Sequence, residues 1–127
     1  MRETMRGFIV AALLLASASA ASAAEKPIDS YYARLSAADH FNSSGERLTT
    51  AAAIIRQDRA NVYVYGKRDS EDDLDDYFNN KANRARLERM VANGSFYGRA
   101  EHDILNGTPL IYVEIYDDSV VVSVKGD

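Results

Sequence analysis

The chain has 127 residues, a formal net charge of −4, no cysteine, no tryptophan and two histidines. This length is that of a single domain. The excess of acidic residues argues against a nucleic-acid binder, which needs a basic face for phosphate contacts. Without cysteine the chain has no disulfide framework, no thiolate metal site and no thiol nucleophile.

The first 24 residues have the three-part pattern of a secretory signal peptide. A short basic region precedes an uncharged apolar stretch (residues 8–16), and a tract of small residues (17–24) follows. We therefore expect residues 1–24 to be removed by cleavage after Ala23 or Ala24. An exported chain without cysteine suits the bacterial periplasm better than a eukaryotic secretory route, so we expect a periplasmic protein.

The alternative for this segment is a permanent membrane anchor. Residues 7–24 form a run of 18 residues without charge, which is at the lower limit for a spanning helix. Nearly half of that run is the alanine and serine tract, whose small side chains gain too little in hydrocarbon to hold it there. We therefore expect no stable membrane anchor after cleavage.

The mature chain shows no internal repeat and no linker that would divide it. Residues 25–45 have weak periodicity, with Pro27 and a polar turn at residues 42–45. We interpret them as an irregular lead-in that holds a short helix or an edge strand, followed by one small α+β domain over residues 46–127.

A helical pattern begins at Glu46 and runs to Val62, with its apolar face on the core and the charged residues 56–59 mostly outward. Ser43 or Ser44 is placed to cap its start. A strand over residues 62–65, which are all β-formers, is the alternative for its end.

Two further helices are predicted from the middle of the chain. Residues 70–73 have the form of a capping box that leads into a helix ending near Phe78. Residues 81–92 place Leu87 and Met90 on one side. The pattern leaves open whether Asn79-Asn80 separates the two segments or one helix runs through both. One further helical turn is expected near residues 101–105.

The clearest element is a β-hairpin with strands at residues 110–116 and 119–125. A two-residue loop at Asp117-Asp118 pairs Ile115 with Val120, and by the same register Val113 with Val122 and Ile111 with Val124. A two-stranded hairpin is not stable alone in water, so it needs a partner for its β-branched face. We therefore predict an α+β fold with two or three helices followed by a C-terminal antiparallel β-hairpin packed on them.

An acidic run with six carboxylates in eight residues covers positions 69–76. Clustered oxygens attract calcium, and the spacing resembles the start of an EF-hand loop. The run lacks glycine at the sixth position, and Asn80 stands at the twelfth where the loop needs glutamate. We interpret it as a capped, solvated helix start and predict no metal ligands.

The remaining catalytic signals are weak. His40 and His102 each stand beside acidic residues, but two histidines without a paired motif do not make a zinc site, and we expect both on the surface. The chain also lacks a nucleophile elbow, a phosphate loop and a dinucleotide fingerprint. We predict no catalytic residues and no cofactor.

Two sets of residues are candidates for binding. The basic side chains on the 81–92 helix could contact an anionic partner, although we favour a solvated helix face as their explanation. Tyr112 and Tyr116 lie on the polar face of the predicted hairpin, and of the tyrosines they are best placed to contact a ligand. These two are our predicted binding residues.

From these observations we expect a small, exported, non-catalytic binding or accessory protein. Its partner would be an unknown protein or another envelope component, and not a nucleic acid. One alternative is a small acidic hydrolase acting on envelope glycan through two carboxylates. The other is a module whose fold is stabilised by calcium.

Cleavage of the leader fixes the mass of the protein isolated from cells. We expect intact-mass spectrometry to show a chain that begins at Ala24 or Glu25. A chain that still carries residues 1–24 would contradict the prediction.

Overall fold

The computed structural model describes residues 25–127, so the predicted leader lies outside the described residues. The chain forms a mixed α+β domain with a four-stranded sheet. Its elements are, in order, β1 (Asp29–Arg34), a 3-10 turn η1 (Ala37–His40), α1 (Ala51–Tyr63), α2 (Lys81–Ala85), α3 (Leu87–Asn93), β2 (Ser95–Phe96), α4 (Ala100–Asn106), β3 (Leu110–Ile115) and β4 (Val120–Gly126).

The sheet has the strand order β1-β3-β4-β2. Strands β3 and β4 form the predicted hairpin with the predicted pairs, among them Ile115 with Val120 and Val113 with Val122. Strand β1 adds antiparallel to β3, and the two-residue β2 adds parallel to β4. The hairpin therefore supplies the two central strands of a mixed sheet rather than a separate antiparallel ribbon.

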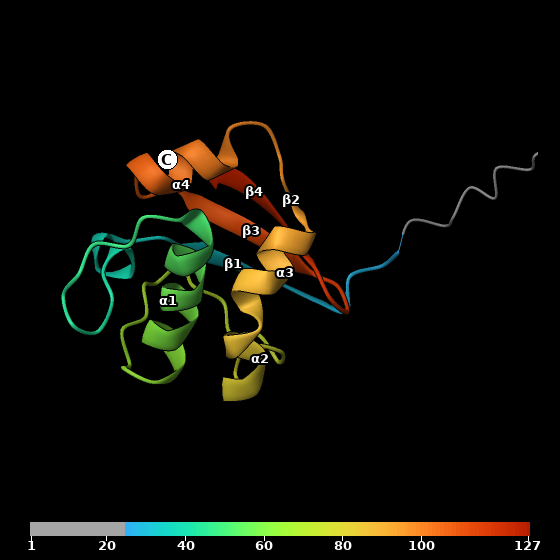
Figure 1. Cartoon of the computed structure of the whole chain (residues 1–127), viewed down its shortest axis with the longest axis horizontal. Helices are drawn as coiled ribbons and strands as arrows, with labels where there is room; N and C mark the ends of the chain where they lie inside the picture. Colours follow the sequence, from blue (N-terminus) through green and yellow to red (C-terminus); the bar gives the residue numbers. More distant parts are fainter. Residues whose placement is uncertain (1–24) are drawn as a thin grey trace, which may run out of the picture.

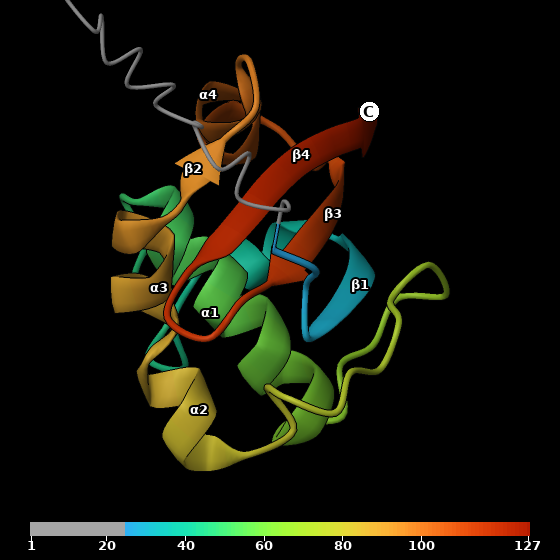
Figure 2. The ribbon, with the colours of Figure 1, turned by 90° about the vertical axis from the view of Figure 1, so that its right-hand side faces the viewer.

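All the helices lie on one face of this sheet. Figure 1 shows α1 and α3 side by side against it, and in Figure 2, after a 90° turn, the sheet lies in front of α1. The core fills the space between the two layers. The buried apolar residues from the strands are Tyr31, Ala33, Ile111, Val113, Ile115, Val120 and Val122, and those from the helices are Ala51, Ile54, Ile55, Leu87, Met90, Val91, Ala100 and Ile104.

The predicted irregular lead-in is partly regular, since it contains β1 and η1. Tyr31 and Ala33 point into the core, whereas Tyr32 between them is exposed. This two-residue alternation is that of a strand with one buried face. The pairing of β1 with β3 extends the hairpin to the three antiparallel strands that a stable sheet needs.

Helix α1 begins five residues later than the sequence pattern indicates. Its N-cap is Thr50, whose hydroxyl accepts a hydrogen bond from the Ala53 amide at 3.1 Å, and not Ser43 or Ser44. The alternative strand over residues 62–65 does not form, because the helix continues to Tyr63 and Val64 is its C-cap. The chain then turns at Gly66, which has a φ of 65°.

Residues 69–80 contain no helix, so the capping-box prediction is wrong. The segment instead runs along the free edge of β1. The Tyr32 amide donates to the Asp73 carboxylate at 2.9 Å, and the Asp73 amide donates to the Tyr32 carbonyl at 2.8 Å. Next along the strand, the Arg34 amide donates to the Asp72 carboxylate at 2.8 Å. These carboxylates accept hydrogen bonds from amides of a strand rather than from amides at the start of a helix.

The 81–92 segment forms two helices, and the break falls at Arg86 rather than at Asn79-Asn80. Leu87 and Met90 are buried as predicted. Helix α3 ends at Gly94, where the backbone approaches β4 so closely that a Cβ atom would lie 1.7 Å from the Val120 carbonyl oxygen. Glycine at this position therefore permits the parallel pairing of β2 with β4.

The largest departure from the sequence pattern is an ion cluster inside the domain. Arg59 and Asp58, which the helical pattern places outward, are 0% and 1% exposed. The Arg59 guanidinium pairs with Asp58 at 2.8 Å and with Asp75 at 2.9 Å, and it lies 3.9 Å above the centre of the Tyr31 ring. Helix α1, the 69–80 loop and β1 therefore meet at one buried cation.

The two carboxylates of this cluster are not equivalent. Asp75 also accepts hydrogen bonds from the Tyr63 hydroxyl and from two backbone amides, which stabilise its charge. Asp58 has an oxygen without a hydrogen-bond partner among the described residues. Burial raises the pKa of Asp58 well above its ordinary value, although Arg59 acts in the opposite direction. Burial and the bond to Asp75 likewise raise the pKa of Tyr63 to about 12.

Because the two carboxylates differ, we expect two matched variants to change the free energy of unfolding by different amounts. Asp58→Asn keeps an oxygen for Arg59 and removes an excess buried charge, so the free energy of unfolding at neutral pH should change by less than about 1 kcal/mol. Asp75→Asn leaves Arg59 without its best-bonded counter-ion and should cost about 3–5 kcal/mol. Chemical denaturation of both variants measures this, and equal losses would contradict the assignment.

The same assignment fixes the sign of the pH dependence. The folded-state pKa of Asp58 is raised, so the native state takes up its proton before the unfolded state does. The Asp58 contribution to stability therefore increases as the pH falls from neutral toward about 4, the ordinary value for Asp. Asp58→Asn should flatten the profile over that range.

Candidate functional site

The sheet face opposite the helices carries a group of tyrosines, which we call the tyrosine face. Alternation along the strands and the strand register bring Tyr32 of β1 beside Tyr112 of β3, and Tyr116 follows at the end of β3. The other members of the face are Arg34, Glu114, Val121, Ser123 and Lys125. In Figure 2 this face of the sheet is turned toward the viewer, and none of the helices of residues 25–127 covers it.

The rings of the tyrosine face are held in place by contacts with one another and with charged side chains. The ring centres of Tyr32 and Tyr112 are 4.8 Å apart, and the Lys125 ammonium lies 5.8 Å from the centre of Tyr112. The Tyr116 hydroxyl donates to Glu114 at 3.4 Å. Burial and, next, the Glu114 carboxylate raise the pKa of Tyr116 above its ordinary value. The two predicted binding residues thus belong to one aromatic surface.

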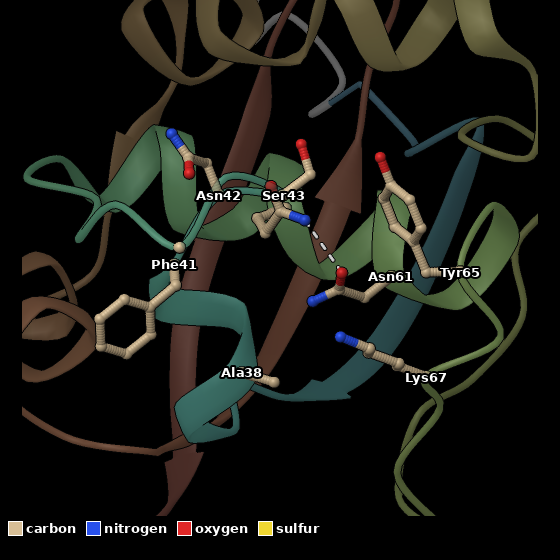
Figure 3. Close-up of a pocket in the computed structure, with 9 residues that line it drawn as sticks. Ala38, Phe41, Asn42, Ser43, Asn61, Tyr65 and Lys67 are labelled. Atoms are coloured by element: carbon tan, nitrogen blue, oxygen red, sulfur yellow. Dashed lines mark hydrogen bonds between the residues drawn. The ribbon is translucent and has the colours of Figure 1, made fainter.

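A second candidate is a pocket of about 340 Å³ between the loop after η1 and the end of α1, which we call the α1 pocket. It is lined by Ala38, Phe41, Asn42, Ser43, Gly45, Gln57, Asn61, Tyr65 and Lys67. Figure 3 shows the Asn61 amide at its centre, with Lys67 directed toward it and Tyr65 on the same side. Phe41 and Tyr65 are 43% and 51% exposed, which leaves both rings open to a ligand.

The floor of the α1 pocket is a chain of buried hydrogen bonds. Asn61 is 3% exposed, and its amide donates to Asp39 at 2.8 Å while its oxygen accepts from Gln57 at 2.9 Å. Asp39 also accepts from the backbone amide and hydroxyl of Ser36. Burial raises the pKa of Asp39, and these hydrogen bonds oppose the shift. The network fixes the orientation of the Asn61 amide, because a flipped amide would set its oxygen against the Asp39 carboxyl.

Four of the six carboxylates in the acidic run make contacts within the domain. Asp72 and Asp73 bond to the backbone of β1, Asp75 belongs to the ion cluster, and Glu71 pairs with Arg34 at 2.8 Å. Within residues 25–127 no group of three His, Asp or Glu side chains is arranged to hold a metal ion. The run is thus neither a helix start nor, in this arrangement, a calcium loop.

The two histidines occupy different environments. His102 is exposed on α4, as predicted, with Asp103 at 3.4 Å. His40 is buried, so its predicted surface position is wrong. Its ring nitrogens lie 2.8 Å from the carbonyl oxygens of Ser36 and Ile104, which links η1 to α4. The structure gives His40 a bridging role between two elements.

The basic side chains on α2 and α3 do not form one solvated stripe. Arg84 is buried and donates to the Phe78 carbonyl at 2.8 Å. Arg86 and Arg89 both reach Asp118 at the hairpin turn, at 3.6 Å and 3.3 Å. These contacts fasten the helices to the hairpin and leave no continuous basic surface along α2 and α3.

Two other pockets of the described chain are each lined by a pair of carboxylates. One has Glu88 and Glu101 among its lining residues, and the other has Asp103 and Asp127. Glu88 and Glu101 are exposed, so neither is held in the desolvated setting that a glycosidase uses to keep an acid protonated. The acids whose pKa burial does raise, Asp39 among them, bond to internal partners.

Comparison of the chain with known protein families, with curated proteins and with solved structures finds no match. Among residues 25–127 no helix is both long and apolar enough to cross a membrane.

Several candidate residues were missed by the sequence analysis. Tyr32 lay in the segment interpreted as irregular, although the alternation of apolar residues from Tyr31 to Leu35 is the signature of a half-buried strand. Gln57 was treated as an outward residue of a helix, and Asn61 was not singled out. Their spacing of four residues was the available signal that the two amides meet.

The hydrogen bonds and ion pairs that the acidic run makes within the domain lead to a prediction about calcium. A chelator should leave the thermal unfolding midpoint unchanged, because no ion is needed to satisfy these carboxylates. Melting curves with and without calcium test this. A midpoint that rises with calcium and falls with chelator would restore the calcium-stabilised alternative.

Proposed function

We propose that the protein is a small, exported, non-catalytic binding module of the bacterial periplasm, and that it binds a protein of the cell envelope through the tyrosine face. The observation that carries this proposal is the packed pair of Tyr32 and Tyr112, with Tyr116 further along the same sheet face, which no helix among residues 25–127 covers. Tyrosine and arginine are the side chains that contribute most to the central contacts of protein interfaces.

The shape of the tyrosine face favours a macromolecule over a small ligand. Its tyrosines line none of the pockets described above, and a small molecule on an open face buries too little of its own surface. A protein surface can cover the face as a whole. Charges of both signs, from Arg34, Glu114 and Lys125, surround the rings and would set the orientation of a partner.

The packing of the rings also favours binding. Tyr32 and Tyr112 already restrict each other, and Lys125 lies against Tyr112. Side chains that are ordered before binding lose less conformational entropy on association. The face therefore resembles a preformed contact surface more than a set of mobile side chains.

The route of strand addition has less support. The β1 edge is occupied by Asp72 and Asp73, and β2 pairs with β4 at Val121 and Val122. At these positions a partner strand would have to displace one of these segments. We therefore propose that the face of the sheet, rather than its edge, contacts the partner.

Hydrolysis of envelope glycan is the weaker proposal. It requires two carboxyl groups facing one substrate, with one kept protonated by its surroundings. Burial raises the pKa of Asp39, Asp58 and Asp72, but their oxygens face the interior of the domain. The exposed pair Glu88 and Glu101 lacks such surroundings.

The test is capture from an envelope extract by matched variants. A partner retained by the wild-type protein should bind Tyr32→Ser and Tyr112→Ser at least about tenfold more weakly, because both remove central aromatic contacts. Tyr65→Ser is the control, since Tyr65 is a similarly exposed tyrosine in the α1 pocket. Cross-linking followed by mass spectrometry should place the contact on β1 and β3.

Equal retention by all three variants would contradict the tyrosine face as the binding surface, as would cross-links confined to other elements. Thermal melting of each variant is run in parallel, so that a loss of binding is not mistaken for a loss of fold.

A further inference from the structure

The α1 pocket has the features of a second binding site, separate from the tyrosine face. It lies at the loop after η1 and the end of α1, and none of its lining residues belongs to the sheet. Its volume of about 340 Å³ is at the small end of the range for ligand pockets. A molecule of the size of one monosaccharide would fill it.

The charge of the pocket selects among small molecules. Of the described residues that line it, Lys67 alone carries a charge, and no carboxylate lines it. This is unusual in a chain with 19 acidic and 15 basic residues. The Asp39 carboxylate bonds to Asn61 from behind and directs its oxygens toward Asn61 and Ser36. The open side of the pocket therefore favours a negative group.

The polar groups at the floor are fixed and rich in donors. Asn61 and Gln57 each use one amide hydrogen internally, so each keeps a second one for a ligand. The Gln57 oxygen remains as an acceptor. Together with the Lys67 ammonium, which Figure 3 shows directed toward Asn61, they form a set of donors that converge on one small volume.

The aromatic walls supply the apolar part of the site. Tyr65 stands beside Lys67 in Figure 3, and half of its surface is exposed. An aromatic ring next to fixed hydrogen-bond donors suits a molecule with one apolar face and several hydroxyl groups. A sugar ring has this combination, and a carboxylate on the ring would pair with Lys67.

We propose that the α1 pocket binds an acidic monosaccharide unit, with its carboxylate on Lys67, its hydroxyl groups on Asn61 and Gln57, and its ring against Tyr65. This site goes beyond the proposed protein-binding function and does not depend on it. The side chain of Asn61 is the positioning group, because Asp39 and Gln57 hold it in the one orientation that presents a donor.

The test is a titration of the ¹⁵N-labelled protein followed by NMR, with D-glucuronate as the probe. We expect saturable shifts of the side-chain amide signals of Asn61 and Gln57, with a dissociation constant of about 1 mM for a ligand of this size. Glucose, which lacks the carboxylate, and acetate, which lacks the ring, should each bind at least about tenfold more weakly.

Two matched variants locate the contact. Lys67→Gln should weaken glucuronate binding about tenfold, since it removes the charge from an exposed side chain and leaves a polar group that is one atom shorter. Lys125→Gln removes an equally exposed ammonium from the tyrosine face and should leave binding unchanged. Unchanged melting midpoints for both variants show that the fold is intact.

Three results would overturn the proposal. They are the absence of a saturable shift up to about 10 mM glucuronate, binding of glucose as tight as that of glucuronate, and wild-type affinity in Lys67→Gln. The first removes the site, the second its preference for an acid, and the third the role of Lys67. None of them bears on the capture experiment with the tyrosine variants.

Discussion

The arrangement of this domain depends on the contacts of the buried Arg59 guanidinium. It joins α1 to the 69–80 loop through Asp75 and rests on the Tyr31 ring of β1. A buried cation is costly unless it is paired and hydrogen bonded, so these partners have to be in place together. Once they are, the loop is held against β1 and the helical layer is in register with the sheet.

The two proposed binding surfaces have different positions relative to the ion cluster of Arg59. The tyrosine face is on the far side of the sheet, where Tyr32 alternates with the buried Tyr31. The α1 pocket lies at the same helix that supplies Arg59, and its floor is the neighbouring buried network of Asn61 and Asp39. Helix α1 thus contributes the buried guanidinium of Arg59 and, two residues later, the buried Asn61 amide at the floor of the α1 pocket.

The parts of the fold that the sequence predicted are those with a strong local pattern. The hairpin register follows from a two-residue loop between alternating β-branched residues, and Leu87 and Met90 follow from helical spacing. The failures have one physical cause. Arg59 and Asp72 are charged, and charged residues are placed outside unless a partner distant in the sequence bonds to them, as Asp75 does to Arg59 and the Arg34 amide does to Asp72. Those partners became visible only when the chain was folded.

The same distinction between local patterns and contacts of distant residues applies to the candidate sites. Tyr112 and Tyr116 could be predicted because the hairpin pattern alone assigns them to one face. Tyr32 could not be added to them without knowing that β1 pairs with β3. The α1 pocket could not be predicted from the sequence, since it requires the contact between Asn61 and Asp39, which are 22 residues apart.

The carboxylates along β1 have a consequence for the behaviour of many copies of this protein together. An outermost strand with vacant amides is a template on which identical molecules stack into fibrils. Here the amides of Tyr32 and Arg34 already donate to the carboxylates of Asp73 and Asp72. A strand of a second molecule could pair with these amides only after displacing the carboxylates, so this edge is blocked as a template.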